Sequence, residues 1–203
     1  MPSASLVHVI DDDEAVRQSL EFLLKTARMQ VRTYESAAAF LSVLPSVSSG
    51  CIVTDVSMPG ISGVDLLRRL KELKIAIPVI VITGHGDVQL AVEAMKIGAM
   101  DFIEKPFDDE MLLASIKAAL GRWEKDGEQQ AERTNLLDKL AMLTKREREV
   151  LEGLVAGKPN KIIAFELGIS PRTVEIYRAN VMTKLSAGSL SALVRTALRA
   201  GLL

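Results

Sequence analysis

The sequence has little of what would place it in a membrane or outside the cell. Its 203 residues include one cysteine, Cys51, so no disulfide can form within the chain. No apolar run approaches the roughly 20 residues of a membrane-spanning helix. The N-terminal MPSASLVHVIDD has no basic stretch before its short apolar run and is not a signal peptide. The chain is therefore expected in the cytoplasm, with no membrane partner.

The net charge is also small, but the two ends of the chain differ in the sign of their charge. The net charge is −1. Residues 1–121 hold 11 lysines and arginines against 16 acids, whereas residues 143–203 hold 10 against 5. An acidic front and a basic back predict two domains with different partners, the second being a polyanion.

The front part alternates short β-branched segments with stretches of helical periodicity. The strand-like segments cover residues 6–10, 30–34, 51–55, 78–82 and 101–103. This alternation predicts an α/β domain with a mostly parallel sheet, covered by helices on both faces.

Polar residues follow these segments where each predicted strand ends. The first runs into Asp11 and Asp12, and the third ends in Asp55. The fourth is followed by Thr83, and the last leads to Lys105. Because ligands bind at the carboxyl edge of such sheets, these side chains are expected to form one site. Carboxylates suit Mg²⁺, while lysine and threonine bind phosphate oxygens. Asp55, at the centre, would be a nucleophile that forms an aspartyl phosphate.

The acidic run Asp11–Glu14 has two interpretations. It is either a solvated turn in which Asp13 caps the next helix, or a cation site. The neighbouring strand ends favour the cation for Asp11 and Asp12 and leave Asp13 at the helix start. Lys105-Pro106 is a candidate cis peptide that would aim the lysine.

The segments VTDVSMPGISG, VITGHGDV and DFIEKPF, together with the acidic pair, resemble the receiver domain of bacterial two-component response regulators. The resemblance covers residues 5–121 and implies a flavodoxin-like, five-stranded parallel sheet of order 2-1-3-4-5. It also implies phosphotransfer from a sensor histidine kinase to Asp55. Mg²⁺ (or Mn²⁺) would be bound by Asp12, Asp55 and the backbone carbonyl of Ser57, with Asp11 acting partly through water.

The same resemblance implies a switch. Phe102 matches the aromatic residue whose rotamer follows Thr83 when phosphate binds. We expect the altered surface, formed by residues 87–120, to make the phosphorylated protein a homodimer. That surface offers Met95, Ile97 and Met111. The opposite charges of the two halves also allow an alternative, in which the unphosphorylated receiver covers the basic domain. His85, in the loop after Thr83, is interpreted as an ordinary exposed histidine.

Residues 122–142 are expected to link two domains, 1–121 and 143–203. The segment is polar and charged and regains apolar character only at its end. Interspersed charges favour a solvated helix that extends the last receiver helix, whereas Gly121 and Gly127 favour a break. The helix is slightly favoured.

Residues 143–203 predict an all-α domain. TKRE at 144–147 has the form of a capping box that opens a helix. A second helix is expected over residues 160–167, stopped by Gly168, and Ser170 then caps a third. Two short helices joined by a glycine turn form a helix-turn-helix unit. A plain helical bundle is the alternative, which the basic charge disfavours.

The third helix has an apolar face, with Val174, Val181 and Leu185, and an opposite polar face. On that face Ile176 could contact a thymine methyl and Glu175 could accept from a cytosine amine. The residues predicted to face bases are Arg172, Thr173, Glu175, Ile176 and Ala179. Those predicted to contact phosphates are Lys158, Asn160, Lys161, Arg178 and Lys184.

The segments LTKREREVL, PNKIIAFELGIS, PRTVE and VMTKL resemble the LuxR-type (GerE) four-helix DNA-binding domain. Glu175 and Tyr177 depart from the lysine and histidine common in that family. Both halves are similar to response regulators of nitrogen fixation. The resemblance implies an activator that binds double-stranded promoter DNA, engages RNA polymerase and serves nitrogen-fixation or microaerobic genes.

Two other classes compete with this interpretation. A Mg²⁺-dependent phosphatase of the haloacid-dehalogenase type would need a second aspartate two positions after Asp55, where this chain has Ser57. An adaptor whose helical half binds protein would show no salt-sensitive DNA binding. No turnover of an external substrate is expected, apart from the chain's own phosphorylation and dephosphorylation.

Overall fold

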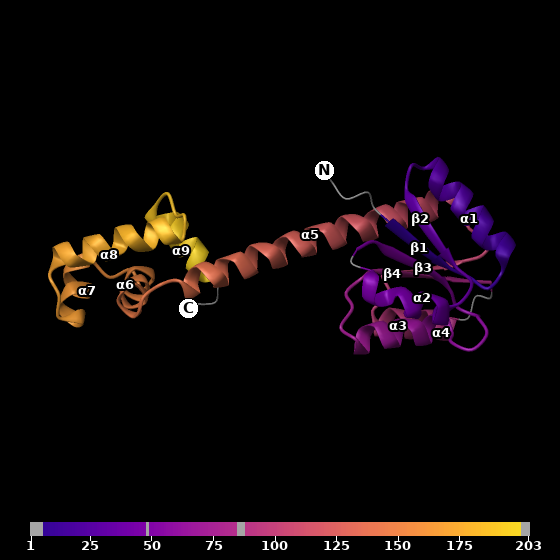
Figure 1. Ribbon diagram of the computed structural model, residues 1–203, viewed down its shortest axis with the longest axis horizontal. Coiled ribbons are helices and arrows are strands. Elements are labelled where there is room, and N and C mark those ends of the chain that lie inside the picture. The colour runs from indigo at the N-terminus through magenta and orange to yellow at the C-terminus, as the bar shows by residue number, and fades with distance from the viewer. Residues whose placement is uncertain (1–5, 48, 85–87, 200–203) are drawn as a thin grey trace. The chain divides into compact units, whose positions relative to one another are not determined.

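The computed structural model describes residues 6–47, 49–84 and 88–199 (Figure 1). It divides into two compact units, Met1–Lys125 and Asp126–Leu203. The division falls inside the segment that the sequence assigns to a linker. His85 lies outside the described residues.

Five strands of the first unit form one parallel sheet in the order β2-β1-β3-β4-β5, as predicted. The strands are β1 (Leu6–Ile10), β2 (Gln30–Tyr34), β3 (Cys51–Asp55), β4 (Val79–Thr83) and β5 (Asp101–Glu104). Their bounds differ from the predicted ones by at most one residue. The first, third and fourth strands end beside one another, so their last residues share one edge of the sheet.

Helices cover both faces of this sheet (Figure 1). Two apolar clusters separate the layers. One face packs against α1 (Glu14–Thr26) and the first part of α5 (Asp109–Ala141), and the other packs against α2 (Ala37–Val43), α3 (Gly63–Glu72) and α4 (Val88–Ile97). A short 3-10 turn, Leu44–Ser46, follows α2. β3 and β4 are buried on both faces, and their sequences CIVTD and VIVIT are apolar except for Thr54, Asp55 and Thr83.

A buried histidine lies inside β1. His8 is fully buried, and its Nδ1 lies 3.1 Å from the hydroxyl of Tyr34. The ring also meets the edge of Phe40, with centroids 5.4 Å apart. Burial lowers the pKa of His8, because a charged imidazole is poorly solvated there.

This histidine should make stability depend on pH. Below about pH 6.5 an unfolded chain protonates His8 while the folded chain does not, so the free energy of unfolding should fall as the pH drops. One such group contributes a slope of up to ~1.4 kcal/mol per pH unit. Urea unfolding at several pH values measures it. His8→Leu should flatten the curve, and His85→Gln, at the only other histidine, should not. An unchanged slope in His8→Leu would contradict the assignment.

The second unit contains the end of α5 followed by α6 (Lys145–Val155), α7 (Asn160–Leu167), α8 (Pro171–Lys184) and α9 (Leu190–Arg199). The capping box of Thr144 and Glu147 is formed in both directions. Gly168, with φ of 67°, ends α7, and the side chain of Ser170 caps α8. The predicted helix-turn-helix is therefore α7, this turn and α8. In the described part of the chain, no helix is long and apolar enough to cross a membrane.

Helix α5 continues through the charged segment to Ala141. It passes Gly121 and Gly127 without a break, so the helical alternative for this segment is the one observed. Each glycine costs a helix about 1 kcal/mol relative to alanine. Burial at the far end offsets that cost, since Leu136, Leu140 and Leu143 pack into the core of the second unit.

Candidate functional site

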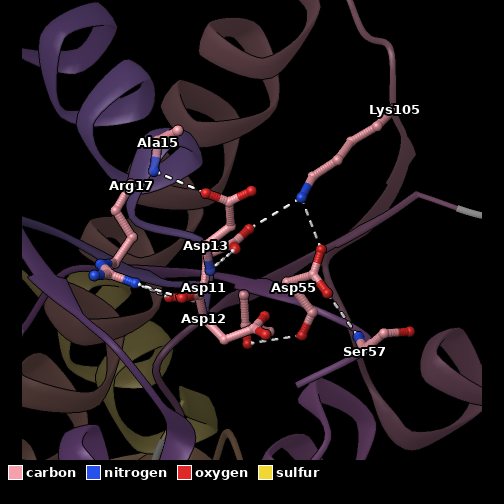
Figure 2. A network of polar contacts seen from close by, with 9 residues as sticks. Asp11, Asp12, Asp13, Ala15, Arg17, Asp55, Ser57 and Lys105 are labelled. Carbon is pink, nitrogen blue, oxygen red and sulfur yellow. Dashed lines mark hydrogen bonds and ion pairs between the residues drawn. The ribbon is translucent and has the colours of Figure 1, made fainter. Parts of the chain in front are cut away.

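Two buried carboxylates and one lysine meet at the carboxyl edge of the sheet. Asp11 follows β1 and Asp55 ends β3; they are 3% and 8% exposed. The Lys105 ammonium reaches between them, 3.0 Å from Oδ2 of Asp11 and 2.8 Å from Oδ1 of Asp55 (Figure 2). Thr83, which ends β4, is 2% exposed, and its carbonyl accepts a hydrogen bond from the backbone N–H of Lys105 at 2.7 Å. The predicted strand-end residues thus come together.

Lys105 offsets the repulsion between the two acids. Burial by itself lowers the pKa of its ammonium, but the hydrogen bonds to Asp55 and Asp11 outweigh burial and raise the pKa. The lysine is therefore charged at neutral pH. The predicted cis peptide Lys105-Pro106 is present. The other carboxylate oxygen of Asp55 accepts from the backbone N–H of Ser57 at 2.6 Å, which fixes the orientation of the carboxylate.

The acidic residues in the loop between β1 and α1 have different contacts (Figure 2). Asp13 caps α1 by accepting from the N–H of Ala15 at 2.8 Å, as predicted. Asp12 is exposed. Arg17, which the sequence did not single out, donates through Nη1 to the carbonyls of Asp11 and Asp12 at 2.7 and 3.0 Å. Arg17 therefore holds the backbone of the two acids by contacts that leave no residue-type pattern in the sequence.

The oxygen atoms at this edge are of the kind that binds a hard cation, but they do not surround one common point. Among the described residues, no three acidic, histidine or cysteine side chains lie close enough to form a ready-made metal site. Asp11 and Asp55 are already drawn together by Lys105, and the exposed Asp12 is the next residue along the chain. Carboxylate and carbonyl oxygens are what Mg²⁺ prefers. The donor chemistry of these residues fits a Mg²⁺ site.

Phe102 lies on β5, half-buried against the apolar cluster on the α2, α3 and α4 side of the sheet. It pairs with Val81 of β4, while Thr83 pairs with Glu104. Because side chains alternate along a strand, Phe102 and Thr83 point to the same face of the sheet from neighbouring strands. The geometry is compatible with the predicted link between them.

The second candidate site is the outer face of α8. Val174, Val181 and Leu185 are buried, as predicted, and Ile176 is 55% exposed. The other residues predicted to face bases, Arg172, Thr173, Glu175 and Ala179, are exposed or half-buried. Thr173 also bonds to the cap, since its hydroxyl lies 2.8 Å from that of Ser170.

The residues predicted to contact phosphates differ in their surroundings. Asn160, Lys161 and Arg178 are exposed or half-buried. The ammonium of Lys158 pairs with Glu166 at 2.7 Å, a surface ion pair that a phosphate can replace at little cost.

Lys184 has hydrogen-bond partners inside its own domain. Its Nζ donates to Oε2 of the buried Glu147 at 2.7 Å and to the carbonyl of Met142 at 3.3 Å. This ion pair competes with the predicted phosphate contact, which stays a prediction, since the Lys184 side chain is 36% exposed. Glu147 is recognisable in the sequence as part of a capping box, but nothing there reveals its partner 37 positions away.

Comparison with known proteins identifies the family of each unit. The response regulator receiver domain matches residues 7–117, and the LuxR family of bacterial regulatory proteins matches residues 141–197. Transcriptional regulatory protein FixJ of Azorhizobium caulinodans is 58% identical over 99% of this chain and 95% of its own. The chain belongs to the FixJ-type response regulators. FixJ of Bradyrhizobium diazoefficiens is 52% identical over 100% of this chain and 99% of its own.

Solved structures extend the comparison of this FixJ-type regulator. Full-length FixJ from B. japonicum aligns with a TM-score of 0.63 at 52% identity, covering 99% of both chains. The response regulator StyR aligns with a TM-score of 0.89 at 38% identity, covering 97% of this chain and 100% of its own. The family is one of transcription regulators and not of enzymes, which excludes the phosphatase alternative. Receiver domains typically bind Mg²⁺ for phosphorylation, and a FixJ homologue implies a sensor kinase and DNA as partners.

Proposed function

We propose that this regulator accepts a phosphoryl group on Asp55 from a FixL-like sensor histidine kinase and then binds promoter DNA. The ammonium of Lys105 between Asp11 and Asp55 is the observation that carries the proposal. These contacts place three groups side by side: the nucleophile Asp55, the metal-binding acid Asp11 and the phosphate-binding cation Lys105. The resemblance to nitrogen-fixation regulators supports activation of nitrogen-fixation or microaerobic genes, with RNA polymerase as a partner. Since a kinase of this kind and promoter DNA meet in the cytoplasm, we propose that location too.

Each residue at the edge of the sheet has a part in the transfer. An oxygen of Asp55 attacks the phosphorus of the donor while the bond from phosphorus to the leaving group breaks. Lys105 and the hydroxyl of Thr83 would bind phosphoryl oxygens. Asp11, Asp12, Asp55 and the backbone carbonyl of Ser57 would hold Mg²⁺ (or Mn²⁺). When bound, this ion neutralises charge on the phosphoryl oxygens.

The output would be a dimer. Drawing Thr83 toward the phosphate leaves room that Phe102 can enter, which would alter the α4 surface. Val88, Val92 and Met95 recur at helical spacing on α4 and are 74%, 47% and 49% exposed. Met111 of α5 is 52% exposed. This apolar stripe supports α4 as the contact between two phosphorylated receivers. Two copies of α8 would then engage two half-sites.

Sedimentation with and without beryllofluoride, an acyl-phosphate mimic, tests the dimer. The full-length protein should shift from monomer to dimer and gain affinity for its promoter. Val92→Asp should block the shift, whereas Phe22→Asp, at a 74% exposed position of α1 on the opposite face of the sheet, should not. A monomer that gains DNA affinity would instead favour release of the basic domain from a covering acidic receiver.

A further inference from the structure

The C-terminal end of α8 is held by an ion pair whose carboxylate is buried. Glu147, in the first turn of α6, is 3% exposed, and its Oε2 accepts a 2.7 Å hydrogen bond from the Lys184 ammonium. The same oxygen accepts from the backbone N–H of Thr144 at 2.8 Å. The hydrogen bond from Lys184 contributes most to lowering the pKa of Glu147. Glu147 is therefore charged at neutral pH, and without Lys184 its buried carboxylate would lack its cationic partner.

Two hydrogen bonds join the C-terminal end of α8 to the C-terminal end of α5. Lys184, the last residue of α8, donates to the carbonyl of Met142, which directly follows α5. In the opposite direction, Lys139 of α5 donates to the hydroxyl of Ser186, just after α8, at 3.1 Å. Ser186 has φ of 52°, a left-handed conformation that costs a residue with a side chain free energy. Each helix end thus carries a lysine bound to the other.

A third cation and a shared core complete this junction. Arg148 of α6 donates to the carbonyl of Leu140 at 3.2 Å. Carbonyls in the last turn of a helix lack partners within it, so such donors satisfy α5 where it ends. Leu140 and Leu143 belong to the same apolar core as Val181 and Leu185.

We propose that Glu147 and Lys184 are positioning residues that fix the reading helix against the end of α5. It follows that residues 136–143 form part of the DNA-reading unit and are more than a linker. The inference rests on the proposed recognition of DNA by α8. Contacts to base edges require the helix to be held within a fraction of an ångström. Loss of either charge should therefore weaken discrimination between sequences, while the number of phosphates contacted stays the same.

The test uses full-length protein phosphorylated with acetyl phosphate and two duplexes, one selected by the wild type from a random library and one scrambled. Glu147→Gln and Lys184→Met should each reduce the preference for the selected duplex about tenfold or more. The slope of log affinity against log salt should not change. The double variant should be no worse than either single, because both remove one interaction. Lys184→Arg should retain most of the preference.

Lys158→Met is the matched control, since Lys158 is another lysine predicted to contact a phosphate and its ion-pair partner Glu166 is exposed. It should weaken both duplexes alike and reduce the salt slope by about one unit. If Lys184→Met does the same while Glu147→Gln leaves binding unchanged, Lys184 contacts a phosphate and the positioning role is wrong. Should Glu147→Gln fail to fold, the salt slope of Lys184→Met still decides. A wild type without any sequence preference would remove the proposed function itself.

Discussion

Replacing Asp55 by asparagine should abolish phosphate incorporation from acetyl phosphate and Mg²⁺. The amide keeps the size of the side chain and can still accept from the N–H of Ser57, so the fold should persist. It lacks the anionic oxygen that attacks phosphorus. Intact mass spectrometry should find one added phosphate on the wild type and none on Asp55→Asn.

Asp65→Asn is the matched control for this experiment. Asp65 lies in the first turn of α3, and its side-chain hydrogen bonds go to Ser62 and Arg68. Its loss should leave phosphate incorporation at the wild-type level. A full phosphate signal on Asp55→Asn would move the phosphoacceptor to another residue and remove the central step of the proposed function.

The parts of the fold that follow local rules could be predicted from the sequence. β3 and β4 are short, mostly apolar segments that are buried on both faces, and their bounds were predicted within one residue. The caps at Thr144, Ser170 and Gly168 also follow from residue types at fixed offsets. Since parallel strands end at one edge of a sheet, the sequence also predicted that Asp11 and Asp55 lie close together.

Contacts between distant segments could not be predicted in this way. Lys184 has the exposed position and charge of a phosphate ligand, and only the fold places it on Glu147. Arg17 binds carbonyls, which every residue has, so its target leaves no trace in the sequence. The path of α5 through Gly127 depends on burial of Leu140 beyond it, a tertiary effect that outweighs helix propensity.

Gly63→Ala should damage both stability and phosphorylation. Gly63 is the first residue of α3, and its N–H donates to the carbonyl of Val56 at 3.0 Å. A Cβ at this position would lie 2.2 Å from the backbone oxygen of Asp55 and 3.1 Å from Cγ2 of Thr54. A backbone oxygen cannot rotate away as a side chain can, so the end of β3 has to shift. The expected cost is about 3 kcal/mol, at the upper end for an overpacked site.

Gly127→Ala separates this effect from the general consequence of replacing a helical glycine. A Cβ at Gly127 meets no described atom within 4 Å, so this variant should gain about 1 kcal/mol of helix stability. Calorimetry of the full-length variants should show opposite shifts in unfolding temperature. Because the shift of β3 also moves Asp55 relative to Lys105, Gly63→Ala should take up phosphate more slowly, and Gly127→Ala should match the wild type. Equal rates in both variants would mean that the site tolerates movement of the strand that carries its nucleophile.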